Sequence, residues 1–122
     1  MKAYVKPRYP TIEQKGIQKW EVKKPIEAFA EETNIYVPMG FMTDGASVPR
    51  IFWPIMPPMS ETYTNAAVVH DYLYKTQKTK NRKTADKIFL NLMEYLGTPR
   101  WKRMIMYRAV RIGGWKPWKK KR

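Results

Sequence analysis

The 122-residue sequence contains no cysteine and only one histidine. The absence of cysteine excludes disulfide bonds and thiolate metal sites, and a single histidine excludes a zinc site built from several imidazoles. Any bound metal ion must therefore be held mainly by oxygen, which is the ligand atom that calcium and magnesium prefer.

Acidic residues and long apolar runs are also scarce. Ten Asp and Glu residues stand against 24 Lys and Arg residues, so the net charge is +14. This excess favours an anionic partner, either an anionic membrane surface or nucleic acid, and the alternative is a charge that serves only solubility. No window approaches the ~20 apolar residues of a membrane-spanning helix, and the N-terminus lacks the apolar core of a signal peptide. We therefore expect a chain made in the cytoplasm without a transmembrane segment.

The hydrophobic pattern of the first third of the chain is typical of strands. Alternating apolar and polar residues predict strands at 17–22, 26–30 and 34–37. These strands would form a small antiparallel sheet, with Pro25 on an edge or at a bulge. Prolines then leave little room for regular structure between residues 38 and 60.

The second half has helical spacing. It predicts one helix from Ser60 or Thr62 to Thr76, a second from Lys83 to Leu96 followed by Gly97, and a third that Pro99 opens and Gly113 ends. The fold class is therefore α+β, with a small N-terminal antiparallel β-sheet, a proline-rich loop and three α-helices. We expect residues 1–114 to form a single globular domain and residues 115–122 to form a basic tail rich in Trp and Lys.

The only histidine lies in the first predicted helix, within residues 66–74. His70 and Asp71 are adjacent, so their side chains point about 100° apart and can border one cavity. Tyr74 lies one turn later, on the same face as His70. A base, a hard oxygen ligand and a second carboxylate from the next helix are the parts of a metal-assisted hydrolytic site.

The second carboxylate is Asp86. If the first two helices form an antiparallel pair, His70 lies about six residues before the turn and Asp86 four or five after it. At ~1.5 Å per residue, the two side chains lie level and can meet. Asp86 would then fix the tautomer of His70, and the other ring nitrogen could take a proton from water. The alternative is a half-buried histidine capped by a carboxylate, with no chemistry.

The proline-rich loop supplies candidate metal ligands. Gly40 and Gly45 permit backbone angles that turn carbonyl groups toward a cation, and Asp44 lies between them. With Asp71, these groups would hold calcium, the expected cofactor, which would stabilise the oxyanion of an ester under attack. The apolar residues 48–59 either cover the core or form a rim that touches lipid or a protein partner.

The third helix and the tail carry much of the positive charge. Lys102, Arg103, Arg108 and Arg111 recur along the helix, and residues 119–122 are all basic. We expect these residues to form a positive surface separate from the acidic site, because they repeat along one helix and the chain can turn back at Gly113.

Most of the chain resembles a known family. The order of residues 41–50, 67–74 and 82–89 is similar to the phage and prophage family called domain of unknown function 1353. That family name carries no activity. The resemblance implies a tailed-phage or prophage origin, synthesis in the host cytoplasm with the virion as a further location, and other phage proteins as partners.

A shorter resemblance concerns chemistry. The run from His70 to Tyr74 resembles the His-Asp-x-x-Tyr helix of phospholipases A2, and residues 85–89 resemble their second-helix aspartate, especially in the cysteine-free domains of parvovirus capsids. The likeness implies that His70 is the base, Asp71 the calcium ligand, Asp86 the orienting acid and Tyr74 a supporting hydrogen-bond donor. The Gly-x-Gly calcium loop of those enzymes is absent, because four residues separate Gly40 from Gly45.

Two functions from different classes follow. The first is a phage or prophage protein with a phospholipase-A2-like, calcium-dependent hydrolytic site that acts on membrane lipid esters. The second is a non-enzymatic basic phage protein, either a virion or tail component or a nucleic-acid-binding accessory factor, in which His70 and Asp86 only tie helices together.

Overall fold

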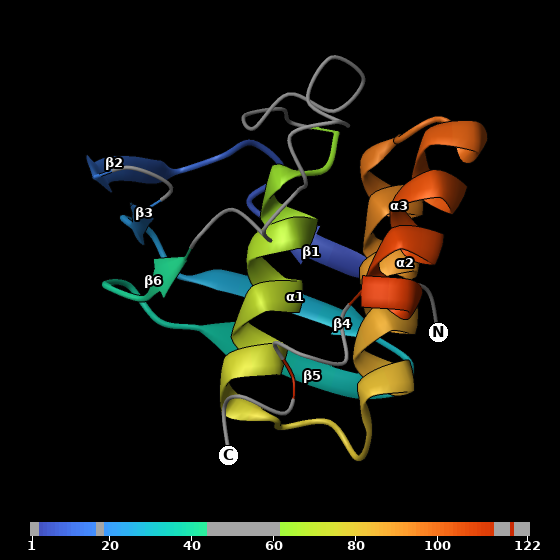
Figure 1. The fold of residues 1–122 in the computed structure, drawn as a ribbon. Coiled ribbons are helices and arrows are strands. Elements are labelled where there is room, and N and C mark those ends of the chain that lie inside the picture. Colours follow the sequence, from blue (N-terminus) through green and yellow to red (C-terminus); the bar gives the residue numbers. More distant parts are fainter. Residues whose placement is uncertain (1–2, 17–18, 44–61, 114–117, 119–122) are drawn as a thin grey trace.

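The computed structural model describes residues 3–16, 19–43, 62–113 and 118, and these residues have the predicted α+β architecture. Six strands are followed by three helices (Figure 1). The strands are β1 (Tyr4–Lys6), β2 (Ile12–Gly16), β3 (Lys19–Val22), β4 (Ile26–Ala30), β5 (Thr33–Val37) and β6 (Met42–Thr43). The helices are α1 (Thr64–Thr76), α2 (Arg82–Leu96) and α3 (Arg100–Gly113).

The strands form two small antiparallel sheets rather than the single predicted one. Their orders are β1-β4-β5 and β2-β3-β6. The predicted strands correspond to β3, β4 and β5, whereas β1, β2 and β6 were not predicted, because two of them are very short and β2 is mostly exposed. Pro25 lies between β3 and β4 and not within a strand, so its predicted place on an edge or at a bulge was wrong. The Ile17 end of the first predicted strand is outside the described residues.

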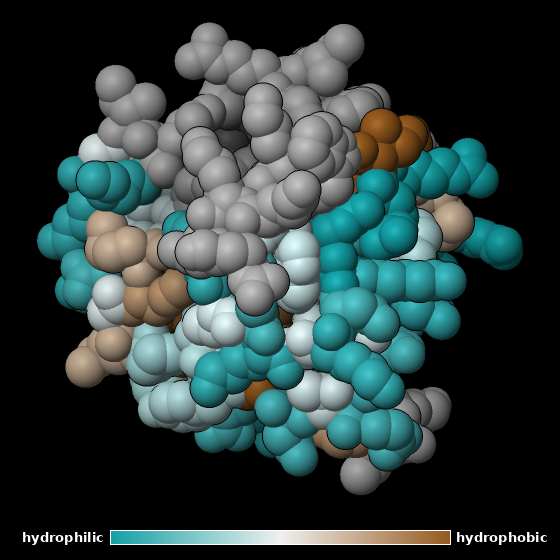
Figure 2. Space-filling model, turned by 60° about the horizontal axis from the view of Figure 1, so that its bottom comes forward, coloured by the Kyte–Doolittle hydropathy of each residue, from teal (hydrophilic) through white to brown (hydrophobic). Residues whose placement is uncertain are grey.

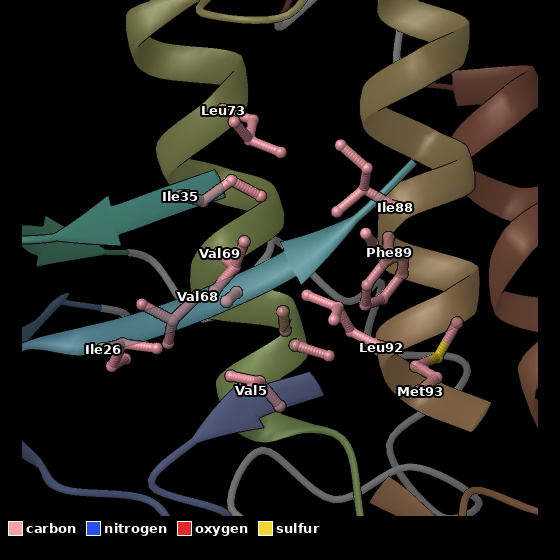
Figure 3. Packing of buried hydrophobic residues seen from close by; sticks show 14 of the residues in the cluster. Val5, Ile26, Ile35, Val68, Val69, Leu73, Ile88, Phe89, Leu92 and Met93 are labelled. Carbon is pink, nitrogen blue, oxygen red and sulfur yellow. The ribbon is translucent and has the colours of Figure 1, made fainter. Parts of the chain in front are cut away.

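Helices α1 and α2 pack side by side against the sheet β1-β4-β5 (Figure 1), and the main hydrophobic core lies between these layers. Figure 3 shows Val69 and Leu73 of α1 facing Ile88 and Phe89 of α2, with apolar side chains of β1 and β4 beneath them. Burying each such side chain contributes about 1.5–3 kcal/mol. The core therefore fixes the spacing and rotation of the two helices that carry the candidate site.

Helix α1 is buried on almost every side, which its sequence explains. Apolar residues surround its axis, and from Thr64 to Tyr74 only Tyr72 is not fully buried. Asn65 ties the helix to the N-terminal segment by donating hydrogen bonds to the carbonyl oxygens of Pro7 (2.7 Å) and Tyr9 (2.9 Å). A polar side chain on such a helix must find partners inside the protein, and this requirement applies to His70.

The helix ends agree with the sequence to within one residue, except at the start of α1. Gly97 follows α2 with a positive φ of 94°, as predicted for the residue after a helix. Helix α3 begins directly after Pro99. The predicted cap of α1 by Thr62 was wrong, because Tyr63 occupies the cap position and no side chain caps the helix; Ser60 lies outside the described residues.

The surface is mostly hydrophilic where Figure 2 shows described residues. Two of the large hydrophobic side chains that are exposed belong to α3, namely Trp101 and Ile112. Within the described parts of the chain, no helix is both long and apolar enough to cross a membrane.

Candidate functional site

The antiparallel pair α1–α2 brings His70 and Asp86 together, as predicted. His70 lies six residues before the end of α1, and Asp86 lies four residues after the start of α2. The His70 Nε2 atom is 2.7 Å from Asp86 Oδ1. The expectation that the two side chains meet across the helix pair is therefore confirmed. Since Asp86 is an acceptor, Nε2 carries the hydrogen and Nδ1 holds the lone pair of the neutral ring.

Asp86 is the centre of a larger group. The hydroxyl of Tyr74 donates to the same Oδ1 atom at 2.6 Å. The second oxygen, Oδ2, accepts a hydrogen bond from Arg111 Nη1 at 2.7 Å and a longer one from Arg82 Nη1 at 3.5 Å. Asp86 is completely buried, so these four donors replace the water that its charge would otherwise bind.

The same contacts decide the ionisation of the group. Burial by itself raises the pKa of Asp86, but the hydrogen bonds from His70, Tyr74 and Arg111 together lower this pKa below its ordinary value. The pKa of Tyr74 is raised, mainly by burial and further by its hydrogen bond to Asp86. Asp86 is therefore a carboxylate and Tyr74 a protonated donor at neutral pH, which are the states that their hydrogen bonds require.

The lowered pKa of Asp86 predicts how acid acts on the fold. A carboxyl group with a lower pKa in the folded state stabilises the protein above its unfolded-state pKa, and this contribution is lost as the pH falls through the folded-state pKa. We expect the ¹³C signal of the Asp86 carboxyl group to titrate with a midpoint below the ordinary 3.8. Unfolding free energy should fall in the same pH range. A midpoint above 3.8 would show that the donors do not offset burial.

The His70 ring is enclosed by aromatic side chains. Its centroid lies 4.4 Å from that of Tyr74 and 4.6 Å from that of Phe89, which stacks on it. Only 4% of the residue is exposed. Among the residues that the structure describes, the ring makes one hydrogen bond, through Nε2. Nδ1 is therefore the nitrogen that remains to accept a proton from water.

The predicted calcium ligands are only partly described. Asp71 is largely buried, and its Oδ2 atom lies 3.2 Å from the Nζ atom of Lys75. Gly40 has a positive φ of 94°, and its backbone N–H donates to the carbonyl oxygen of Val22. Asp44 and Gly45 lie outside the described residues, as do residues 48–59. The described residues contain no group of three or more His, Cys, Asp or Glu side chains placed to hold a metal ion.

Lys75 is one described partner of Asp71, the predicted calcium ligand. Besides Asp71, the Nζ atom of Lys75 contacts the carbonyl oxygen of Met42 at 3.3 Å. That carbonyl belongs to the segment from which loop ligands were expected.

Two arginines of the site were not predicted. Arg111 was expected on a positive surface, but it turns inward to Asp86, so this part of the prediction was wrong. Arg103, which does not contact Asp86, was expected on the same surface and also turns inward, where it donates to the carbonyl oxygen of Thr98. The second arginine of the site is Arg82. Arg82 binds Asp86 and donates to the carbonyl oxygens of Val110 and Arg111 at the end of α3. The four-residue spacing of Arg82 and Asp86 was the one available signal in the sequence.

One residue of the predicted tail reaches the site. The Trp118 ring meets the Tyr74 ring edge to face, with centroids 5.2 Å apart, and its carbonyl oxygen accepts a hydrogen bond from the Gln77 side chain. Trp118 thus covers the outer side of the tyrosine that binds Asp86. The other residues of the tail, 115–117 and 119–122, lie outside the described part of the chain.

Comparisons with known proteins give a family but no activity. The family described as "Protein of unknown function (DUF1353)" matches residues 20–110. A protein of Sinorhizobium fredii (strain NBRC 101917 / NGR234) called "Uncharacterized protein y4jT" is 39% identical over 79 residues, which are 64% of this chain and 23% of that protein. The chain thus spans less than a quarter of this relative. No solved structure matches the chain.

Proposed function

Because the chain belongs to the DUF1353 family, whose description names no activity, we propose its function from the site: hydrolysis of a membrane lipid ester by a phospholipase-A2-like base. The observation that carries this proposal is the 2.7 Å contact between His70 Nε2 and Asp86 Oδ1, with the Tyr74 hydroxyl on the same oxygen. This arrangement leaves His70 Nδ1 as the basic atom.

The proposed reaction needs no nucleophilic side chain. Nδ1 of His70 removes a proton from a water molecule while the water oxygen attacks the carbonyl carbon of the ester. The imidazolium that forms is stabilised by the Asp86 carboxylate, to which Nε2 stays bonded. When the ester C–O bond breaks, the imidazolium returns its proton to the departing alkoxide, and the neutral base is restored. Tyr74 and Arg111 keep the carboxylate in position throughout.

The setting of this reaction follows from charge and from the resemblance. Helix α3 has no acidic residue, and three of its five basic residues, Arg100, Lys102 and Arg108, remain for the surface because Arg103 and Arg111 turn inward. Its exposed Trp101 and Ile112 suit the boundary between headgroups and acyl chains. We propose an anionic membrane surface as the partner that presents the substrate. The proposal further includes a phage or prophage origin, synthesis in the host cytoplasm, and a place in the virion or contact with other phage proteins.

The test is the release of fatty acid from vesicles that contain phosphatidylcholine and phosphatidylglycerol. We expect the wild-type protein to release it in proportion to enzyme concentration, because the proposed mechanism needs only the base, its orienting acid and a basic surface. The assay should be run with calcium and with a chelator. Absence of release under both conditions would contradict the hydrolase.

A second candidate function has its own supporting observation. Only 4% of His70 is exposed, Asp86 is fully buried, and two arginines already balance the carboxylate charge. These features equally suit a site that holds three helices together in a non-enzymatic phage protein. Binding of the protein to duplex DNA or to another virion protein, together with no hydrolysis, would support this function and would make calcium unnecessary.

A further inference from the structure

We propose that Arg111 binds a phosphate oxyanion with the hydrogen-bond donors that it does not use for Asp86. The site lies near the end of α3, where the guanidinium group of Arg111 reaches from the buried carboxylate to the protein surface. Its ligand is a phosphate group, either free or in a lipid headgroup. Only one consequence rests on the proposed function, namely that the substrate is a lipid ester that carries a phosphate.

The guanidinium group of Arg111 has more donors than the protein uses. Of its five N–H groups, one on Nη1 donates to Asp86 Oδ2 at 2.7 Å. Among the residues that the structure describes, neither Nη2 nor Nε of Arg111 has an acceptor. These two atoms present parallel N–H groups along one edge of the planar group, which is the arrangement that binds a phosphate through two oxygens. Since 31% of the side chain is exposed, the group is not sealed from a ligand.

The charges around Asp86 favour an added anion. The guanidinium groups of Arg111 and Arg82 share this one carboxylate, with Nη1 atoms 2.7 and 3.5 Å from Oδ2. Arg82 also donates to two carbonyl oxygens at the end of α3, whereas Arg111 has no second acceptor in the described part of the chain. About two thirds of the Arg111 side chain is covered, so water screens its charge less than that of an exposed arginine. An oxyanion would supply the missing negative charge and the missing acceptors together.

The neighbours of Arg111 on α3 favour a lipid headgroup as the source of the phosphate. Ile112, the next residue, is 77% exposed, so an apolar side chain lies in solvent beside the site. Arg108 is exposed and lies one helical turn before both residues, on the same side of the helix. A phospholipid provides a phosphate for the arginines and acyl chains for Ile112, whereas a free phosphate leaves Ile112 in water.

The first test observes Arg111 directly in the wild-type protein. The Nε–H signal of Arg111 is followed by ¹H–¹⁵N NMR while inorganic phosphate is added at constant ionic strength. We expect a saturable shift of this signal, because the phosphate accepts a hydrogen bond from Nε, and no saturable shift when chloride replaces phosphate. The signal of the exposed Arg108 should move less. An Arg111 signal that does not respond to phosphate would overturn the inference.

The second test changes the geometry of the site while keeping its charge. Arg111→Lys retains a cation beside Asp86 but lacks the parallel N–H groups, so its affinity for inorganic phosphate in calorimetric titrations should fall on the order of tenfold. The matched control is Arg108→Gln, which removes a charge one turn away and should weaken binding less. An equal loss in both variants would show that phosphate responds only to the overall charge, which would overturn the inference. If Arg111→Lys did not fold, the wild-type NMR titration would still decide.

Vesicles of phosphatidylcholine and phosphatidylglycerol distinguish the two sources of phosphate. If the ligand is a headgroup, Arg111→Lys should lower the fraction of protein that sediments with the vesicles more than Arg108→Gln does. If Arg111→Lys loses phosphate but binds vesicles as the wild type does, the site is confirmed with a free phosphate as its ligand. Fatty acid release is measured separately. Phosphate binding at Arg111 without release confirms the site and contradicts the hydrolase, and release without phosphate binding overturns the inference while the hydrolase stands.

Discussion

His70→Ala should reduce the hydrolysis of vesicle lipid by a factor of roughly 10²–10⁴, which is the usual contribution of a general base. The substitution removes Nδ1, the atom that accepts the proton of the attacking water. Asp86 keeps its bonds from Tyr74 and Arg111, so the carboxylate is not left without partners. We therefore expect the variant to remain folded, with a wild-type far-UV circular dichroism spectrum, while the initial rate of fatty acid release falls.

Two further variants make this result specific. Tyr74→Phe removes one donor to Asp86 but keeps the ring, so the rate should fall less than in His70→Ala. Thr76→Ala changes an exposed residue of the same helix and should leave the rate unchanged. If His70→Ala hydrolysed lipid as fast as the wild type, His70 would not be the base, and the structural function of the His70–Asp86 pair would be favoured.

Asp86→Asn should lower the free energy of unfolding by about 3–5 kcal/mol, the usual cost of removing one partner of a buried ion pair. The amide cannot balance the charge of Arg111, whose Nη1 atom lies 2.7 Å from the carboxylate, or of Arg82. It also offers a donor where the site needs only acceptors. Urea denaturation of the variant and the wild type at pH 7 gives the difference.

A double variant shows whether the loss of stability comes from the unpaired charge of Arg111 or from a general disturbance of the packing. In the double variant Asp86→Asn/Arg111→Met, the unpaired charge of Arg111 is absent, so part of the lost stability should return. Glu13→Gln, which removes an exposed carboxylate that is also paired with lysines, is the matched control and should change stability little. Wild-type stability of Asp86→Asn would mean that Asp86 does not carry the buried charge assigned to it.

The sequence predicted the features that depend on local periodicity. The spacing of apolar residues located all three helices, since it follows from 3.6 residues per turn. The contact between His70 and Asp86 could also be predicted from the sequence, because a short turn between two antiparallel helices fixes which residues lie level. Both predictions required only helix geometry and the length of one loop.

Features that depend on the packing of the third helix and on short strands could not be predicted from the sequence. Arg111 is 25 residues from Asp86 along the chain, and its spacing within α3 is that of an ordinary basic residue. Only the packing of α3 on α2 decides that it turns inward. Strands β1 and β6 are too short for a detectable alternation of apolar and polar residues. The contact of Lys75 with the carbonyl oxygen of Met42 likewise depends on where the chain passes α1 after β5.

The position of Asp86 among all three helices affects how the protein opens. Its donors come from α1 through His70 and Tyr74, from α2 through Arg82 and from α3 through Arg111. If α3 detached alone, the carboxylate would lose its closest cation, and the carbonyl oxygens at the end of α3 would lose Arg82. Partly open forms that lack α3 are therefore costly, and the slowly exchanging amide hydrogens of the three helices should be released in a common, cooperative event.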